Sequence, residues 1–585
     1  MAPADLGGPA KVRKTVIRAG LLSALALALA EPALADVPVI VPPPVSVPLP
    51  RQLNDADRDA YRQVFQALRS GNYQTASTKL ETLQAGVLTP MARAELILSG
   101  STARDPDALA ALLSQSPELP EAPALAKLSA NGAVLPVQHT LVRMAGPSKR
   151  AATRPNRDCA TLAAKVQPML RADDATGAEP LVEAAADSIS PEALTEWRQK
   201  VAWVYFENGD DVSARRVASL AQTGAGDWAV DAAWVNGLAS WRAGDFAAAR
   251  DAFDRVASNA GDDETRAAGW FWGARSRSAA GDTASATPRL EAASRLGETF
   301  YGMLASAALG IPDLSASALA ATDMQALLRH PNLRAAAALV EIGEANLADQ
   351  MIRYQARIGA PAEHGQLIGF AAALNLPSTQ IWLAQNAPAG THASLAARYP
   401  MPGWAPAQGW RIDPALVYAH ALQESEMRVD AVSRSGARGL MQLMPTTAQL
   451  IARHKGDVVR PLDDPSVSFE YGQSYLEELA ATGGTNGLLP KVIAAYNAGP
   501  NNVARWTAGT NDPLLFIESI PFAQTRAYVA IVLRNYWIYQ RKTGTPTTSM
   551  AALAAGRWPS FPARASLQTA SAQSQSAGAA TFAPN

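Results

Sequence analysis

The sequence predicts a mainly α-helical protein with at least two folded units. A chain of 585 residues is too long for one hydrophobic core, because single cores stop growing at roughly 250–300 residues. Alanine is abundant, aromatic residues make up only 6% of the chain, and apolar and charged residues recur at helical spacing. Alternating β-branched runs are few, so the pattern favours helices and argues against a large parallel sheet.

The N-terminus has the pattern of a secretory signal. A basic stretch precedes an apolar run at 19–30, and the small residues Ala33 and Ala35 provide a cleavage site. The apolar run ends at Glu31 and is shorter than the roughly 18 residues that a membrane anchor needs. We therefore expect residues 1–35 to be a signal peptide, and the mature protein to be periplasmic without stable insertion in the membrane.

Charge and metal-ligand patterns exclude several functions. The 51 Lys and Arg residues nearly cancel the 52 Asp and Glu residues, which argues against nucleic acid as a partner. Six histidines are scattered without metal-ligand spacing, and Cys159 is the only cysteine. With no Gly-rich phosphate loop either, we expect no metal and no cofactor.

The region 51–400 is predicted to be a superhelix of stacked helical hairpins, preceded by a proline-rich linker at 36–50. Three Gly-Asp steps each follow an aromatic-bearing apolar helix: Gly209-Asp210, Gly244-Asp245 and Gly281-Asp282. Their separations of 35 and 37 residues are close to the roughly 34-residue period of tetratricopeptide helix pairs. Such stacking produces a concave surface that could guide substrate or bind protein partners. The alternative for its tryptophans is plain core packing.

A change of composition near residue 400 marks a second domain at 401–545. Residues 546–585 are rich in Ala and Ser and are predicted to be disordered. Within the second domain, Asp413 is well placed to cap a helix over 414–423. Glu424 lies near the end of that helix among apolar neighbours. Loss of hydration there would raise the pKa of its carboxyl group, as a general acid requires. The alternative is a solvated residue at a helix end.

The segment 433–445 has features that suit a sugar ligand. It reads Ser-Arg-Ser-Gly-Ala-Arg-Gly-Leu-Met-Gln-Leu-Met-Pro, and its two glycines permit a tight backbone course. Ser433 and Gln442 offer neutral hydrogen-bonding groups, while Met441 and Met444 offer adaptable apolar surface.

This segment resembles the first signature of the soluble lytic transglycosylases, which have a goose-type lysozyme-like catalytic domain. Further blocks follow in the expected order: Tyr-Gly-Gln-Ser-Tyr-Leu at 471–476, Ala-Ala-Tyr-Asn-Ala-Gly-Pro at 494–500, and a last block at 518–529. The resemblance is close in the C-terminal domain and looser over 51–400.

The resemblance implies a specific site and reaction. Glu424 would be the single catalytic acid/base, and the glycan cleft would be lined by Ser433, Gln442, Met444, Tyr496, Asn497 and Tyr528. The enzyme would cleave the β-1,4 bond between N-acetylmuramic acid and N-acetylglucosamine in peptidoglycan, leaving a 1,6-anhydromuramoyl end.

This sequence departs from the family pattern at three positions: Met427, Gln524 and Glu470. Two nearby carboxylates, those of Glu426 and Asp430, are expected to face solvent, so no second catalytic carboxylate is apparent.

Two alternatives to the transglycosylase remain. The first is a hydrolase with the same cleft, which would use a water molecule as nucleophile. The second is a non-catalytic glycan-binding scaffold, in which the superhelix performs the function. In either case the superhelix is a candidate surface for cell-wall protein partners.

Overall fold

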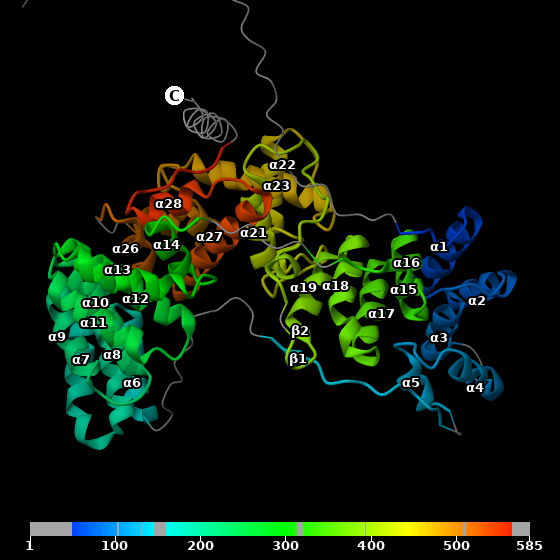
Figure 1. Ribbon diagram of the computed structural model, residues 1–585, viewed down its shortest axis with the longest axis horizontal. Helices are drawn as coiled ribbons and strands as arrows, with labels where there is room; N and C mark the ends of the chain where they lie inside the picture. Colours follow the sequence, from blue (N-terminus) through cyan, green and yellow to red (C-terminus); the bar gives the residue numbers. More distant parts are fainter. Residues whose placement is uncertain are drawn as a thin grey trace, which may run out of the picture. The chain divides into compact units, whose positions relative to one another are not determined.

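The computed structural model describes residues 49–101, 105–129, 132–144, 159–312, 319, 321–391, 393–506 and 510–563. All of them belong to one compact unit, Val41–Asn585. Helices dominate it (Figure 1), which confirms the predicted mainly α class. The signal peptide and nearly all of the linker predicted for 36–50 lie outside the described residues. No helix within the described ranges is long and apolar enough to cross a membrane.

The first group of helices comprises α1 (Asp55–Arg69), α2 (Tyr73–Thr82), α3 (Thr89–Ser99), α4 (Pro106–Gln115) and α5 (Ala122–Ala126). These helices share a hydrophobic core with a later group, and the fully buried Phe65 and Leu339 belong to the same cluster. The later group comprises α15 (Met324–Leu327), α16 (Pro331–Glu341), α17 (Ala345–Ile358), η3 (Pro361–Glu363), α18 (His364–Ala373), α19 (Pro377–Gln385) and α20 (Leu395–Arg398). Strand β1 (Val142–Arg143) pairs antiparallel with β2 (Asn386–Ala387), and thereby ties the segment after α5 to the end of α19.

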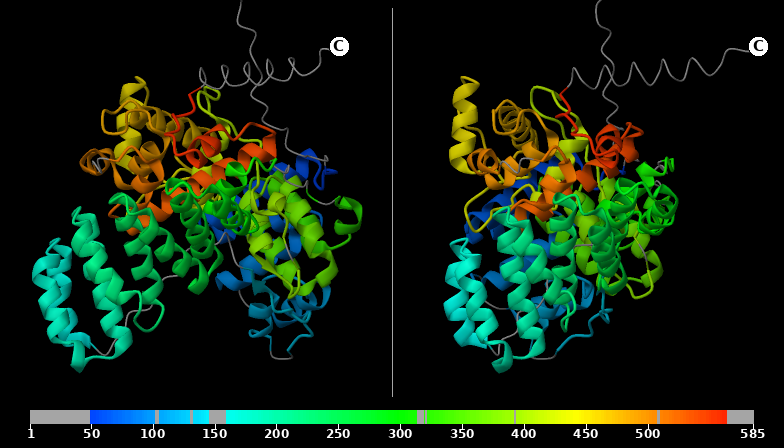
Figure 2. Two further views of the ribbon diagram at one scale, coloured as in Figure 1. Left: turned by 60° about the vertical axis from the view of Figure 1, so that its left-hand side comes forward. Right: turned by 90° about the vertical axis from the view of Figure 1, so that its left-hand side faces the viewer.

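The hairpin region comprises α6 (Ala160–Arg171), α7 (Ala175–Ala184), η2 (Ala186–Ser188), α8 (Pro191–Glu207), α9 (Asp211–Ala221), α10 (Trp228–Arg242), α11 (Phe246–Asn259), α12 (Asp263–Ala279), α13 (Thr283–Ser294) and α14 (Phe300–Ala308). From α8 to α13, successive helices pack against each other side by side (Figures 1 and 2). This arrangement agrees with the predicted stack of helical hairpins.

The three Gly-Asp steps are the turns of these hairpins. The glycines have left-handed φ angles of 81°, 77° and 84°, which favour glycine because it has no Cβ. Each following aspartate then caps the next helix; Asp245, for example, accepts a hydrogen bond from the backbone N–H of Ala248 at 3.1 Å. The same dipeptide therefore forms the turn, through its glycine, and starts the next helix, through its aspartate.

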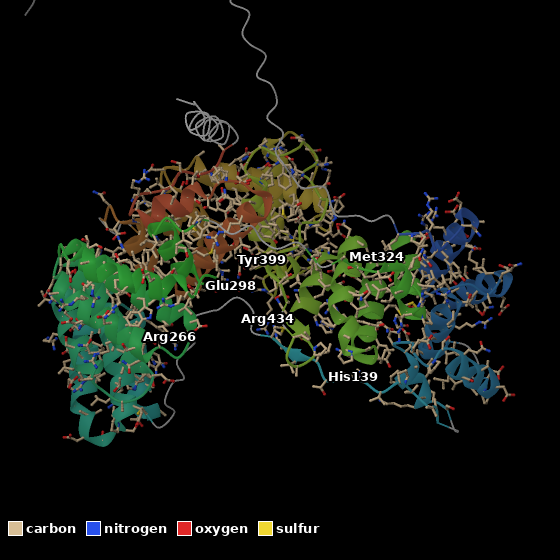
Figure 3. The ribbon with its side chains drawn as sticks, viewed as in Figure 1. His139, Arg266, Glu298, Met324, Tyr399 and Arg434 are labelled. Carbon is tan, nitrogen blue, oxygen red and sulfur yellow. The ribbon has the colours of Figure 1, made fainter. Side chains whose placement is uncertain are left out.

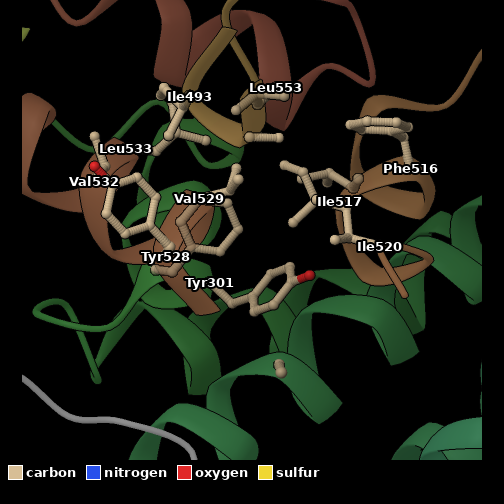
Figure 4. Packing of buried hydrophobic residues seen from close by; sticks show 14 of the residues in the cluster. Tyr301, Ile493, Phe516, Ile517, Ile520, Tyr528, Val529, Val532, Leu533 and Leu553 are labelled. Carbon is tan, nitrogen blue, oxygen red and sulfur yellow. The ribbon is translucent and has the colours of Figure 1, made fainter. Parts of the chain in front are cut away.

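The C-terminal group comprises α21 (Pro414–Ser425), α22 (Pro445–His454), α23 (Pro465–Ala480), α24 (Leu489–Ala498), α25 (Pro500–Arg505), α26 (Pro513–Glu518), α27 (Ala523–Thr543) and α28 (Thr548–Ala554). It shares one hydrophobic core with the hairpin region. Phe300 of α14 stacks on Trp537 of α27 with ring centroids 5.3 Å apart, and Figure 4 shows the neighbouring Tyr301 beside Ile520 and Val529. Residues on both sides of position 400 thus contribute to this core, and the division at 400 stays a prediction.

The segment between α20 and α21 is also held by specific contacts. Arg398 forms an ion pair with Glu298 at 2.7 Å, and the buried Tyr399 donates a hydrogen bond to Asn535 at 3.2 Å. Figure 3 labels Glu298 and Tyr399, which lie where this segment meets α27 and the end of α13.

The predicted disordered tail is wrong for residues 546–563. Helix α28 buries Met550 and Leu553, and the chain beyond it forms backbone hydrogen bonds to Gly487 and Leu489. These few apolar residues suffice because they complete an existing core instead of forming their own. Residues 564–585 lie outside the described residues.

Candidate active site

Glu424 occupies the last turn of α21. Asp413 caps this helix by accepting a hydrogen bond from the N–H of Ala415 at 3.0 Å, and Pro414 takes the first helical position. The helix ends at Ser425, and the left-handed backbone of Glu426 (φ 50°) turns the chain away. Because residues 414–421 of α21 are all buried, the carboxyl group is carried near the end of a helix that is packed in the core.

A hydrogen bond from Tyr528 holds the Glu424 side chain. The Tyr528 hydroxyl of α27 donates to Oε1 of Glu424 at 2.5 Å. Burial raises the pKa of Glu424 to about 7, and the Tyr528 hydrogen bond acts in the opposite direction. Near neutral pH the carboxyl group therefore populates both its acid and its base form, as a residue must that first donates and then accepts a proton.

His420 is a member of this site that the sequence prediction missed. It lies one helical turn before Glu424, and its Nδ1 is 2.8 Å from the Tyr528 hydroxyl. The ring is fully buried, and this burial lowers the pKa of His420 to about 3, so it is neutral. The i, i+4 spacing from Glu424 was the available signal, because such residues share a helix face.

The signature loop after α21 is anchored beside Glu424. Ser425 donates a hydrogen bond to the carbonyl of Leu440 at 3.0 Å, and Tyr496 of α24 donates to the carbonyl of Met441 at 2.7 Å. The Tyr496 ring also lies next to His420, with centroids 4.6 Å apart. The loop and three helices therefore meet at one place around the carboxyl group.

Two side chains that were predicted to bind sugar form hydrogen bonds within their own loop. Ser433 Oγ accepts a hydrogen bond from the N–H of Ala437 at 3.0 Å. Gln442 has a left-handed backbone (φ 45°), and its side-chain amide donates to the carbonyls of Ala431 and Gly439. These contacts give Ser433 and Gln442 a structural task, whatever they contact in a bound ligand.

The other predicted residues are placed less directly. Met444 is 40% exposed at the start of α22, where it can present apolar surface. Asn497 accepts a hydrogen bond from the Thr525 hydroxyl of α27 at 2.7 Å. Glu424 is therefore joined directly to Tyr528, Tyr528 to His420, and His420 to Tyr496. Met444 lies on the surface.

The remaining carboxylates near this segment have other surroundings. Glu426 and Asp430 are exposed, and Asp430 accepts a hydrogen bond from Asn346. Glu470 is fully buried, and one of its oxygens lies 2.7 Å from both Arg411 and Lys455. Burial alone would raise the pKa of Glu470, but these two cations outweigh burial and lower it.

The structure also shows the surroundings of the other two departures from the family pattern, Met427 and Gln524. Met427 is buried, and Gln524 lines a cavity of about 880 Å³ between α27 and the hairpin region. Glu424 does not line that cavity. Across the described ranges, no group of three or more His, Cys, Asp or Glu side chains could hold a metal ion.

An α-helical superhelix joined to a lysozyme-like domain, in which Tyr528 holds the largely enclosed Glu424, defines the class of protein. The comparison with known families agrees, since residues 404–514 match the family described as Transglycosylase SLT domain. The C-terminal part of this chain therefore matches an SLT domain, in agreement with the resemblance found in the sequence.

Curated relatives match about a quarter of the chain. The soluble lytic murein transglycosylase of Escherichia coli K12 is 37% identical over 156 residues, which are 26% of this chain and 24% of that protein. A putative soluble lytic murein transglycosylase of Haemophilus influenzae is 36% identical over 143 residues, 23% of each chain. The chain thus spans about a quarter of the length of these relatives in the match.

Solved structures extend the likeness in fold. The crystal structure of the 70 kDa soluble lytic transglycosylase of Escherichia coli has a TM-score of 0.52 at 19% identity, covering 87% of this chain and 99% of that one. Lytic transglycosylase Slt of Pseudomonas aeruginosa, solved as an inactive mutant, has a TM-score of 0.52 at 21% identity, covering 84% and 74%. The fold beyond the SLT domain is therefore shared as well.

Proposed function

We propose that this protein is a peptidoglycan lytic transglycosylase that uses Glu424 as its single acid/base. The observation that carries the proposal is the buried Glu424 carboxyl group, whose pKa of about 7 and hydrogen bond from Tyr528 suit both proton donation and proton acceptance. The match to the SLT domain and the relatives named lytic murein transglycosylases support the same reaction.

The reaction needs only one carboxyl group. Protonated Glu424 gives its proton to the glycosidic oxygen between N-acetylmuramic acid and N-acetylglucosamine, and the bond to C1 breaks. The acetamido group of the muramic acid helps to stabilise the oxocarbenium-like state. The Glu424 carboxylate then removes the proton from the C6 hydroxyl of the same sugar as that oxygen closes onto C1.

This closure explains why a second catalytic carboxylate is dispensable. Glycosidases with two carboxyl groups use the second one to attack carbon or to activate water. A hydroxyl on the same sugar has a large effective concentration, so the carboxylate of Glu424 alone suffices as its base. The exposure of Glu426 and Asp430 and the ion pairs of Glu470 are consistent with a one-carboxylate mechanism.

The proposal includes the glycan cleft and the location. Met444 would contribute exposed apolar surface, while Ser433 and Gln442 would shape the loop that the glycan contacts. Tyr496 and Asn497 would complete the wall beside Tyr528. Residues 1–35 would direct export to the periplasm, where peptidoglycan is found, and the superhelix would offer a surface for cell-wall proteins.

Mass spectrometry of the fragments released from purified peptidoglycan tests the proposal, with Glu424→Gln as the control. Fragments lighter by one water molecule than those released by a lysozyme, and absent with the Gln variant, are the expected result. Full-mass fragments with reducing ends would instead identify a hydrolase. Binding to peptidoglycan with no fragments from the wild-type protein would identify a scaffold.

A relative offers a second probe. A solved soluble lytic transglycosylase, with a TM-score of 0.51 to this chain, is a complex with bulgecin A. We expect bulgecin A to protect this protein against thermal unfolding and to inhibit fragment release.

A further inference from the structure

His420 forms one end of a hydrogen-bond chain that ends on Glu424. The chain runs from Nδ1 of His420 to the hydroxyl of Tyr528 at 2.8 Å, and from that hydroxyl to Oε1 of Glu424 at 2.5 Å. It joins α21 to α27 and returns to α21. All three side chains are largely withdrawn from solvent, so water does not readily replace these bonds.

The chain has a direction that chemistry dictates. Ionised Glu424 can only accept hydrogen bonds, so the Tyr528 hydroxyl must donate its single proton to it. The Tyr528 oxygen can then only accept from His420, and Nδ1 of the neutral imidazole must carry the ring proton.

The other ring nitrogen agrees with this assignment. Among the described residues, Nε2 of His420 is buried without a hydrogen-bond partner. A proton on Nε2 would create a buried, unsatisfied N–H donor, which is the costlier arrangement. The tautomer with the proton on Nδ1 therefore agrees with the surroundings of both ring nitrogens.

We propose that His420 is a positioning residue that fixes the direction of the Tyr528 hydrogen bond and thereby keeps the Glu424 proton on Oε2. Because Nδ1–H occupies the Tyr528 oxygen, that hydroxyl does not turn to accept a proton from Oε1. The acid form of Glu424 then carries its proton on the oxygen that Tyr528 leaves for the substrate. This inference rests on the proposed role of Glu424 as the acid.

The neighbouring titratable groups do not compete in the relevant pH range. Besides Tyr528 of α27, the ring of Tyr496 of α24 contacts His420, and the ring of Tyr475 of α23 contacts Tyr496. Burial raises the pKa of all three above the ordinary value for tyrosine. Between pH 5 and pH 8, Glu424 is therefore the member of this cluster that changes charge.

The first test detects the tautomer directly and does not depend on activity. In the full-length protein labelled with ¹⁵N-histidine, six histidines contribute signals, and the one lost in His420→Leu is assigned to His420. We expect a neutral ring protonated on Nδ1 at every pH from 5 to 8. A ring protonated on Nε2, or one that titrates in this range, would overturn the proposal.

The second test separates positioning from simple packing. His420→Leu removes the donor, and we expect kcat for fragment release to fall roughly three- to tenfold with little change in KM, as expected for one lost hydrogen bond. The alkaline limb of the pH profile should move up by about half to one pKa unit, because the carboxylate loses stabilisation. His420→Asn places an amide N–H near the Nδ1 position and should restore both values.

The controls distinguish the possible failures. His364→Leu removes another buried histidine, on α18, whose Leu367 and Phe370 belong to the separate core shared by α1–α5 and α15–α20, and it should leave the pH profile unchanged. A folded His420→Leu variant with the wild-type profile would refute the positioning role. If the wild-type protein releases no fragments but His420 shows the Nδ1–H tautomer, the proposed function fails and the hydrogen-bond chain stands.

Discussion

The hydroxyl of Tyr528 lies 2.5 Å from Oε1 of Glu424, although 104 residues separate them in the sequence. The two residues meet because α21 and α27 pack against each other within one hydrophobic core. This contact joins Glu424 to α27, the helix whose Trp537 also stacks on Phe300 of the hairpin region. The chemistry of Glu424 therefore depends on packing that extends into the hairpin region.

Replacing Glu424 with Gln should abolish turnover and preserve the fold. The amide keeps the size of the carboxyl group but has no acidic proton to donate, so we expect at least about a hundredfold loss of kcat. Fragment release from peptidoglycan measures the rate, and circular dichroism with a glycan-binding assay checks folding and binding. Near-normal rates in a folded Gln variant would contradict the assignment of Glu424 as the acid.

Replacing Tyr528 with Phe should have a milder effect. The Tyr528 hydrogen bond lowers the pKa of Glu424, so its loss should raise that pKa above about 7. We expect the alkaline limb of the pH profile to move upward and kcat to fall less than in Glu424→Gln. A Phe variant as inactive as the Gln variant would show that Tyr528 takes part directly in the chemistry.

The stability of the protein should depend on pH through Glu424. Its pKa is about 7 in the folded protein and near 4.5 in the unfolded chain, so the folded state holds the proton more tightly. Ionisation therefore costs stability as the pH rises from about 4.5 to 7. Below this window the cost is absent, and above it the cost is at most about 3 kcal/mol. Glu424→Gln should be more stable than the wild type in urea at pH 8, with a smaller difference at pH 5. A difference that is the same at both pH values would count against the raised pKa.

The two glycines of the signature loop should differ in their response to alanine. Both have left-handed backbones, but a Cβ at Gly436 meets open space, whereas at Gly439 it collides with the carbonyl oxygen of Leu462. Gly436→Ala should cost about 1 kcal/mol, and Gly439→Ala several times more, since backbone must move. Urea unfolding of both variants measures the difference, and equal costs would show that the loop yields at Gly439.

Removing the buried charge of Glu470 should destabilise the protein. Glu470→Gln leaves Arg411 and Lys455 without their shared carboxylate, and breaking a buried ion pair from one side costs about 3–5 kcal/mol. Glu477→Gln is the matched control, because Glu477 also pairs with Arg411 but is partly exposed. Similar melting temperatures for the two variants would contradict a structural role for Glu470.

Much of the site could be predicted from local sequence. Glu424, Tyr496 and Tyr528 lie in motifs whose residues and order are informative by themselves, and the structure brings all three together around His420. His420 was missed because a histidine within an apolar helix is more often a packing residue, and its i, i+4 spacing from Glu424 becomes informative only when Tyr528 is placed beside both. Its importance comes from the hydroxyl of a residue on another helix.

The sequence by itself determined the features that depend on near neighbours in the chain. The Gly-Asp dipeptides set the hairpin turns and the helix starts, because glycine permits the left-handed turn and aspartate caps the next helix. Asp413 and Pro414 likewise set the start of the helix that carries Glu424.

Only the tertiary structure decided which distant side chains share a core or a hydrogen bond. It places α28 against a core that the sequence around it does not reveal, and it turns Gln442 and Ser433 toward their own loop. It also gives buried Glu470 two cations as partners. Such contacts join residues far apart in the chain, so burial and partner, which set the pKa and the role of each group, follow from packing rather than from local sequence.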